Sequence, residues 1–86
     1  MNVTTEQIHI ASEINARVHE LDRPGATDIS IFVAMSDLMP AFQQLVTISG
    51  HSGMSELCSK FSGLYRYSKI LEHMADGVAT GVIKVP

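Results

Sequence analysis

Apolar residues recur every three or four positions along three stretches of this chain, and that spacing limits the fold more than any other feature. It places side chains on one face of an α-helix, whereas a half-buried strand would need alternate apolar positions. Pro24-Gly25 and the Gly/Ser-rich segment 49–53 separate the three stretches. The sequence therefore predicts an all-α protein, a small antiparallel three-helix bundle with short connections.

The first helix is expected over residues 5–22. Thr4 and Gln7 have the spacing of a capping box, and Glu6 lies where the helix dipole favours an acid. The segment Asp22-Arg23-Pro24-Gly25 should end the helix. The predicted core stripe comprises Ile8, Ala11, Ile14, Val18 and Leu21.

The second helix is expected over residues 29–49, after Asp28 as the N-cap or Thr27 as the alternative. Its apolar positions are Phe32, Met35, Met39, Phe42 and Val46. Pro40 lacks a backbone N–H and crowds the preceding turn, so this helix should either kink or split there. The apolar spacing continues through Pro40, which favours a kink.

The third helix is expected over residues 54–76, and it carries a heptad-like apolar seam. Its length exceeds what one small core can cover, so we expect it to contact its own chain on one side and a second copy on the other. The small residues Ser55, Ser59 and Gly63 would let another helix approach closely. The predicted homodimer seam consists of Leu57, Phe61, Leu64, Leu71 and Ala75. The tail, residues 78–86, should be short and extended.

The 86 residues, with a mass of 9.4 kDa, have room for one helical domain spanning residues 1–86. The net charge of −3 argues against a generic nucleic-acid binder, which needs a clustered positive surface. A single cysteine, Cys58, allows no internal disulfide. No signal-peptide pattern is visible, and polar residues interrupt the apolar stretch 29–48. We expect a cytoplasmic protein that does not contact a membrane.

The titratable residues give little support for a reaction centre. Glu6 and His9 form one Glu-x-x-His pair with Glu13 one turn later, but the second such pair of a di-iron site is missing. These residues are expected to lie on a solvated helix face. Cys58 lies beside the apolar seam, where a buried thiol is usually unreactive. His51 lies in a Gly/Ser segment, and no neighbouring residue in the sequence is placed to orient its imidazole. We therefore expect no enzyme, no catalytic or metal-binding residue and no cofactor.

An interaction surface is the better-supported hypothesis. Tyr and Arg dominate interface hot spots, and the third helix carries both beside two lysines. The predicted partner-binding residues are Lys60, Arg66, Tyr67 and Lys69, and Met54 and Met74 could add an adaptable surface.

The sequence thus favours a small protein–protein interaction module: a regulator, adaptor, inhibitor or assembly subunit that docks an apolar helical face to another protein. One alternative is a dimeric nucleic-acid-binding regulator that uses Lys60, Arg66 and Lys69, and the overall acidity argues against it. A metal-binding helical protein using Glu6, His9 and Glu13 is the least favoured alternative.

Overall fold

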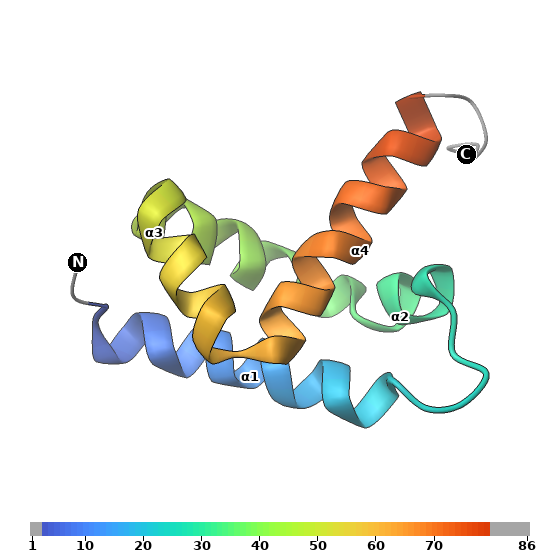
Figure 1. Ribbon diagram of the computed structural model, residues 1–86, viewed down its shortest axis with the longest axis horizontal. Coiled ribbons are helices and arrows are strands. Elements are labelled where there is room, and N and C mark those ends of the chain that lie inside the picture. Colours follow the sequence, from blue (N-terminus) through green and yellow to red (C-terminus); the bar gives the residue numbers. More distant parts are fainter. Residues whose placement is uncertain (1–2, 80–86) are drawn as a thin grey trace.

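The computed structural model describes residues 3–79, and within them it contains four α-helices and a short 3₁₀ turn. The all-α class is therefore confirmed for this part of the chain. The elements are α1 (Thr5–Leu21), α2 (Asp28–Ala34), η1 (Ser36–Leu38), α3 (Met39–Lys60) and α4 (Ser62–Ala79). Figure 1 shows α1 along one edge of the molecule, with α3 and α4 meeting above its middle and diverging from there.

Helix α1 begins where the sequence predicts. The Gln7 N–H donates to Thr4 Oγ1 at 3.2 Å, and the Thr4 N–H donates to Gln7 Oε1 at 2.6 Å, so the capping box is complete. The Gln7 side chain is buried, and its Nε2 also donates to Ser49 Oγ on α3 at 2.9 Å. One side chain therefore caps α1 and ties it to a residue 42 positions away.

The second predicted helix is divided, and the division lies ahead of Pro40. Helix α2 ends at Ala34, η1 follows, and α3 begins at Met39 with Pro40 in its first turn. Backbone N–H groups in the first turn of a helix have no intrahelical acceptor. Proline, which lacks an N–H, therefore fits there without causing a kink. The N-cap of α2 is Thr27, the alternative to Asp28, and it forms a capping box with Ser30.

Helix α3 continues past the segment where the sequence predicts an end. Gly50 has φ 67° and ψ −176°, a conformation that only glycine adopts readily, and the helix changes direction there. The chain then remains helical to Lys60.

The predicted continuous helix over 54–76 is interrupted at Phe61, whose φ of −120° and ψ of 101° are extended. Helix α4 then starts against α1, and the Gly63 N–H donates to Asn15 Oδ1 at 2.6 Å. A Cβ on Gly63 would lie 2.7 Å from the Asn15 carbonyl oxygen and 2.9 Å from its Cα. The small size of Gly63 predicted that another helix could approach closely there. The structure shows this close approach, and the approaching helix is α1 of the same chain.

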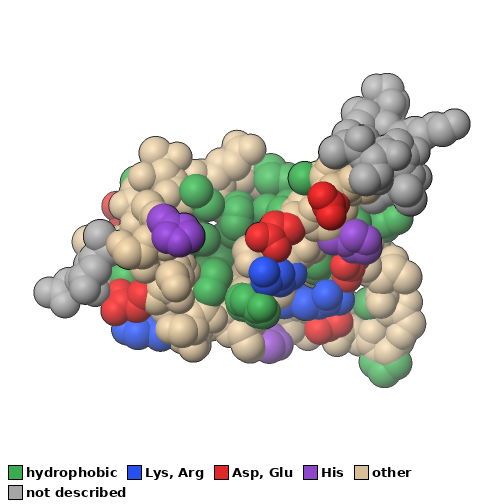
Figure 2. Space-filling view, turned by 45° about the horizontal axis from the view of Figure 1, so that its top comes forward, with side chains coloured by type: hydrophobic (Ala, Val, Ile, Leu, Met, Phe, Trp, Pro, Cys, Tyr) green, Lys and Arg blue, Asp and Glu red, His purple; other side chains and the backbone are tan. Residues whose placement is uncertain are grey.

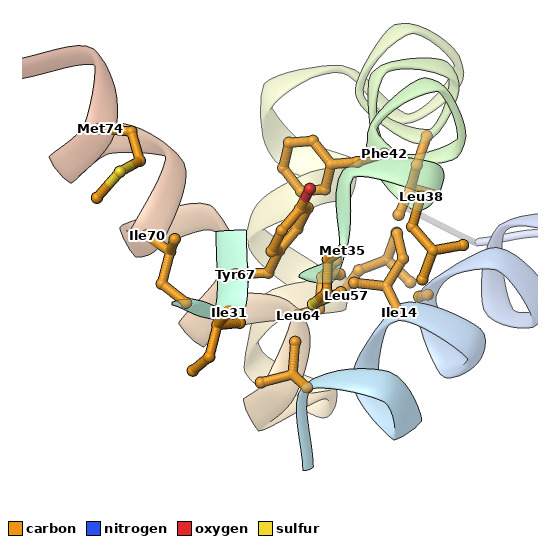
Figure 3. Close-up of a cluster of buried hydrophobic side chains, with 13 residues drawn as sticks. Ile14, Ile31, Met35, Leu38, Phe42, Leu57, Leu64, Tyr67, Ile70 and Met74 are labelled. Atoms are coloured by element: carbon orange, nitrogen blue, oxygen red, sulfur yellow. The ribbon is translucent and has the colours of Figure 1, made fainter. Parts of the chain in front are cut away.

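The core draws side chains from every helix and is closed by α4 across α1 and α2. Figure 3 shows Tyr67 and Ile70 of α4 pointing toward residues of α2 and α3. The fully or nearly fully buried apolar residues are Ala11, Ile14, Val18, Ile31, Met35, Leu38, Phe42, Leu45, Leu57, Leu64, Tyr67, Ile70 and Met74. The backbone of residues 78 and 79, where an extended tail was predicted, belongs to α4, and the rest of that tail (80–86) lies outside the described residues.

Candidate functional site

Tyr67, predicted to be a partner-binding residue at the surface, lies in the core. Its side chain is 0% exposed, and its ring meets the Phe42 ring edge-on with centroids 5.1 Å apart (Figure 3). Burial raises the pKa of its phenol, and the buried hydroxyl has no hydrogen-bond partner among residues 3–79. Tyr67 is buried because α4 is rotated about its axis relative to the prediction. The stripe that faces the core runs through Tyr67, Ile70 and Met74, about one residue away from the predicted seam. Tyr67 therefore has no surface to present to a partner.

Two of the three basic residues predicted to bind a partner, Arg66 and Lys69, form ion pairs within the chain. The Arg66 guanidinium lies 2.9 Å from Asp28 Oδ1 and 3.9 Å from Asp22 Oδ2. Lys69 Nζ lies 3.1 Å from Glu72 Oε2 and 5.4 Å from the centre of the Tyr65 ring. Two of the three cations therefore face acids of their own chain, and Lys60 is exposed at the end of α3.

Asp28 is the centre of the ion-pair cluster that holds α4 to α2. His73 Nδ1 lies 2.7 Å from Asp28 Oδ2, and Arg66 contacts the other carboxylate oxygen. The hydrogen bond from His73 and, less strongly, the Arg66 charge lower the pKa of Asp28 against the opposing effect of burial. This cluster stabilises the packing of α4 and is a structural feature of the fold.

The predicted dimer seam is split between two environments. Leu57 and Leu64 are fully buried in the core, and Phe61 is half-buried at the junction between α3 and α4. Leu71 is half-buried and Ala75 is exposed. Phe61, Leu71 and Ala75 therefore keep some exposed surface, and of these three Leu71 and Ala75 line the same hollow.

Leu71 and Ala75 form one wall of an open groove between α3 and α4. The groove has a volume of about 580 Å³, and α3 supplies the opposite wall on both sides of the bend at Gly50. An adjoining hollow of about 450 Å³ extends it toward Cys58 and Tyr65. The lining residues of the larger part are Phe42, Val46, Gly50, His51, Met54, Ser68, Leu71, Glu72 and Ala75.

We refer to this feature as the α3–α4 groove. Figure 2 shows hydrophobic side chains gathered between the two helices, with charged groups along α4 beside them. Val46 is 41% exposed, and its lost contact with water on docking would contribute to binding. The described residues that line a further hollow all belong to α4, between Lys69 and Asp76.

The groove contains few polar groups able to perform chemistry. Burial raises the pKa of the Cys58 thiol more than the neighbouring Ser68 and Lys69 lower it, so this residue lacks the thiolate character of a reactive cysteine. The hydrogen bond with Glu72 raises the pKa of Lys69 and keeps that amine charged. His51 is exposed at the rim.

Within residues 3–79, no three His, Cys, Asp or Glu side chains come close enough together to hold a metal ion. Glu6, His9 and Glu13 are exposed on α1, and Arg17 is paired with Asp37 at 3.2 Å. Over the same residues, no single helix is both long and apolar enough to cross a membrane. Helix α2 and the segment Ser36–Lys60, which meet at a 61° bend, reach that length and composition only as a pair.

The sequence predicts some of the residues that line the groove but not how α3 and α4 come together to form it. Met54, predicted as adaptable surface, lines the groove, whereas Met74 is buried in the core. The apolar spacing places Val46 on the core stripe and residues 49–53 predict a helix end, whereas Val46 is 41% exposed and the chain bends at Gly50 and remains helical. No pattern in the sequence reveals that α3 resumes after Gly50 and turns to face α4.

Comparison with protein-family models, with curated proteins and with solved structures found no match.

Proposed function

We propose that this chain is a protein–protein interaction module that receives an amphipathic helix of a partner in the α3–α4 groove. The observation that carries the proposal is an apolar groove with helical walls on both sides, left open on the surface of a small all-α chain. Helix-in-groove docking uses this geometry, with apolar anchors spaced by three and four residues along the incoming helix.

The shape of the groove favours an elongated occupant. Its volume of about 580 Å³ lies in the range of ligand clefts, but it is open along its length and continues into the adjoining hollow. An enclosed small molecule would need walls that bury most of its surface, and the groove lacks them. A helix lying along it would cover Val46 and Met54 on one side and Leu71 and Ala75 on the other.

Charge favours a partner with basic flanks. Lys69 and Glu72 neutralise each other at 3.1 Å, which leaves Asp76 as the next charge along α4. The whole chain carries a net charge of −3. Long-range attraction would therefore speed the encounter with a helix that carries lysines or arginines beside its apolar stripe.

The test is an NMR titration of the full-length ¹⁵N-labelled protein with helical peptides that carry a leucine stripe. One peptide has lysine flanks, a second has glutamate flanks, and a third has the first composition in scrambled order. We expect the lysine-flanked peptide to shift the amide signals of Val46, Gly50, Met54 and Ala75 most strongly.

A matched pair of variants distinguishes binding in the groove from nonspecific binding elsewhere on the surface. Val46→Asp places a charge in the groove and should weaken binding by more than about tenfold. Val33→Asp makes the same change on α2, where the side chain is 64% exposed and outside the groove, and should leave binding unchanged. If neither ordered peptide shifts the groove amides, or if both variants weaken binding equally, the proposed function is wrong.

A further inference from the structure

The bend in α3 is made at a single residue. Gly50 is the one residue inside Met39–Lys60 whose backbone is not helical, with φ 67° and ψ −176°, and Figure 1 shows α3 changing direction on the way to α4. Gly50 is exposed, and a Cβ added to it would meet no atom within 4 Å. A return of this one residue to helical φ and ψ would make α3 one straight helix of 22 residues, about 33 Å long.

The bend also divides the described chain into two units that share a covalent connection only at Gly50. The first unit comprises residues 3–49, and the second comprises residues 51–79. The side chains of the second unit that complete the buried core of the first are Leu57, Leu64, Tyr67, Ile70 and Met74. None of these packing contacts requires the two units to come from the same chain.

Polar contacts join the same two units. The Gly63 N–H donates to Asn15 Oδ1 at 2.6 Å, and the Arg66 guanidinium lies 2.9 Å from Asp28 Oδ1. His73 Nδ1 lies 2.7 Å from the other oxygen of that carboxylate. The surface of the first unit therefore recognises the second unit by shape, hydrogen bonding and charge together.

We propose that Gly50 is the hinge of a domain-swapped dimer, in which the second unit of each copy packs against the first unit of the other. Straightening of α3 at Gly50 carries the second unit away from its own chain, and the identical surface of another copy can receive it. The core and polar contacts between the units are then formed again between chains. Exchange of an identical element is a low-cost route to a dimer for this reason.

The backbone at Gly50 decides between the monomer and the dimer. A continuous helix closes the backbone hydrogen bonds that a break leaves open at two helix ends, which favours the dimer. Association costs translational and rotational freedom, and glycine adopts a positive φ without a steric penalty, so both of these effects favour the monomer. The two forms should interconvert slowly, because exchange requires the second unit to leave the core.

The exchange needs no occupant in the α3–α4 groove and is therefore separate from the proposed function. Val46 and Leu71, which line this groove, belong to different units. In the swapped dimer, each groove would thus have walls from two chains. Peptide titration of the isolated monomer tests the groove alone, whereas the monomer–dimer measurements use no peptide.

The first experiment measures the mass of the full chain after refolding. The chain is unfolded in guanidinium chloride, refolded at about 1 mM, where partly folded chains associate, and analysed by size-exclusion chromatography with light scattering. We expect a main species of 9.4 kDa and a smaller fraction of twice that mass that persists after dilution. A chain that forms no species of twice the mass under these conditions overturns the exchange.

Gly50→Ala tests the hinge. Alanine is strained at φ 67° and favours a helix, and each dimer relieves that strain at two hinges, so the association constant should rise by more than about 100-fold. Gly25→Ala is the matched control, because Gly25 has φ 92° and also has no atom within 4 Å of an added Cβ. It follows Pro24, which disfavours a helix through this segment, so this variant should lose stability and remain monomeric. Equal dimer formation by both variants, or none by Gly50→Ala, overturns the hinge.

The contact between Phe42 and Tyr67 reports whether the units have exchanged. The two rings have centroids 5.1 Å apart and belong to different units. The dimer is refolded from an equal mixture of ¹³C-labelled and unlabelled chains, and isotope-filtered NOEs are recorded. A swapped dimer gives NOEs between Tyr67 of one chain and Phe42 of the partner subunit. A dimer in which this contact occurs only within each chain overturns the exchange.

Replacement of Gly50 by D-alanine keeps the test decisive if Gly50→Ala does not fold. A D-residue prefers a positive φ, so it should hold the bend and lower the dimer fraction below that of the unmodified chain. Cys58, the single cysteine, offers a ligation point for joining two synthetic fragments. A dimer fraction equal to or above that of the unmodified chain would overturn the hinge at Gly50.

Discussion

Replacement of Gly63 by alanine is the sharpest perturbation of this fold, because it adds one methyl group where α4 crosses α1. The new Cβ would lie 2.6 Å from Asn15 Oδ1, 2.7 Å from the Asn15 carbonyl oxygen and 2.9 Å from its Cα. Two of these three atoms belong to the backbone of α1 and cannot rotate away. The helices must separate, and the hydrogen bond from the Gly63 N–H to Asn15 Oδ1 must lengthen.

The expected cost follows from two opposing effects. Alanine favours helix by up to about 1 kcal/mol over glycine, with less benefit in the first turn, where Gly63 lies. Overpacking a close contact costs about 1–3 kcal/mol, and loss of the hydrogen bond adds about 1 kcal/mol. We expect a net destabilisation of about 2 kcal/mol, which for a domain of this size lowers Tm by roughly 8–16 °C.

Thermal and urea unfolding followed by circular dichroism at 222 nm would measure this change. Ser12→Ala, a substitution at an exposed residue of α1, is the control and should change the free energy of unfolding by less than about 0.5 kcal/mol. Asn15→Ala in the Gly63→Ala background removes one of the three clashes and should recover only part of the loss. An unchanged or higher Tm for Gly63→Ala would refute the close approach of α1 and α4.

Three further expectations concern buried or paired polar groups. Ser49→Ala deprives the buried Gln7 Nε2 of its acceptor and should cost about 1–2 kcal/mol in urea denaturation; an unchanged midpoint would contradict the bond. Tyr67→Phe removes a buried hydroxyl that has no partner in the described part of the chain, so calorimetry should show an equal or higher Tm, and a marked loss would mean that the hydroxyl is bonded. Asp28→Asn should lower Tm at pH 7, because the carboxylate is held by His73 and Arg66. The pKa of Asp28 is depressed in the folded state, so its contribution is present above the ordinary value of 3.8 and is lost as the pH falls through the folded value. The difference in Tm between the two proteins should therefore narrow below pH 3.8, and a gap that stays constant down to pH 2 would argue against the pairing.

The sequence by itself determined the features that depend on neighbours along the chain. The three- and four-residue spacing predicted an all-α protein, and the Thr4–Gln7 pair placed the start of α1 correctly. Ala11, Ile14 and Val18 of the predicted stripe are buried. These features follow from local physics, since capping and helical periodicity act within one or two turns.

Only the tertiary structure decided where the long helices end. Phe61 offers no side-chain cap, yet α4 begins just after it because Asn15, 48 positions earlier, accepts the Gly63 N–H. Pro40 fits the first turn of α3 because the chain had already turned through η1. Neither break can be recognised from adjacent residues.

The candidate site was decided in the same way. Two apolar stripes run along α4, one through Tyr67 and Ile70 and one through Leu71 and Ala75. Successive residues are about 100° apart around the helix axis, so a rotation of that size exchanges one stripe for the other. Periodicity permits either stripe to face the core. The contacts with α1 and α2 buried the first, which removed Tyr67 from the surface and left the second as a wall of the groove. That choice depends on packing between helices far apart in the sequence, and no local pattern encodes it.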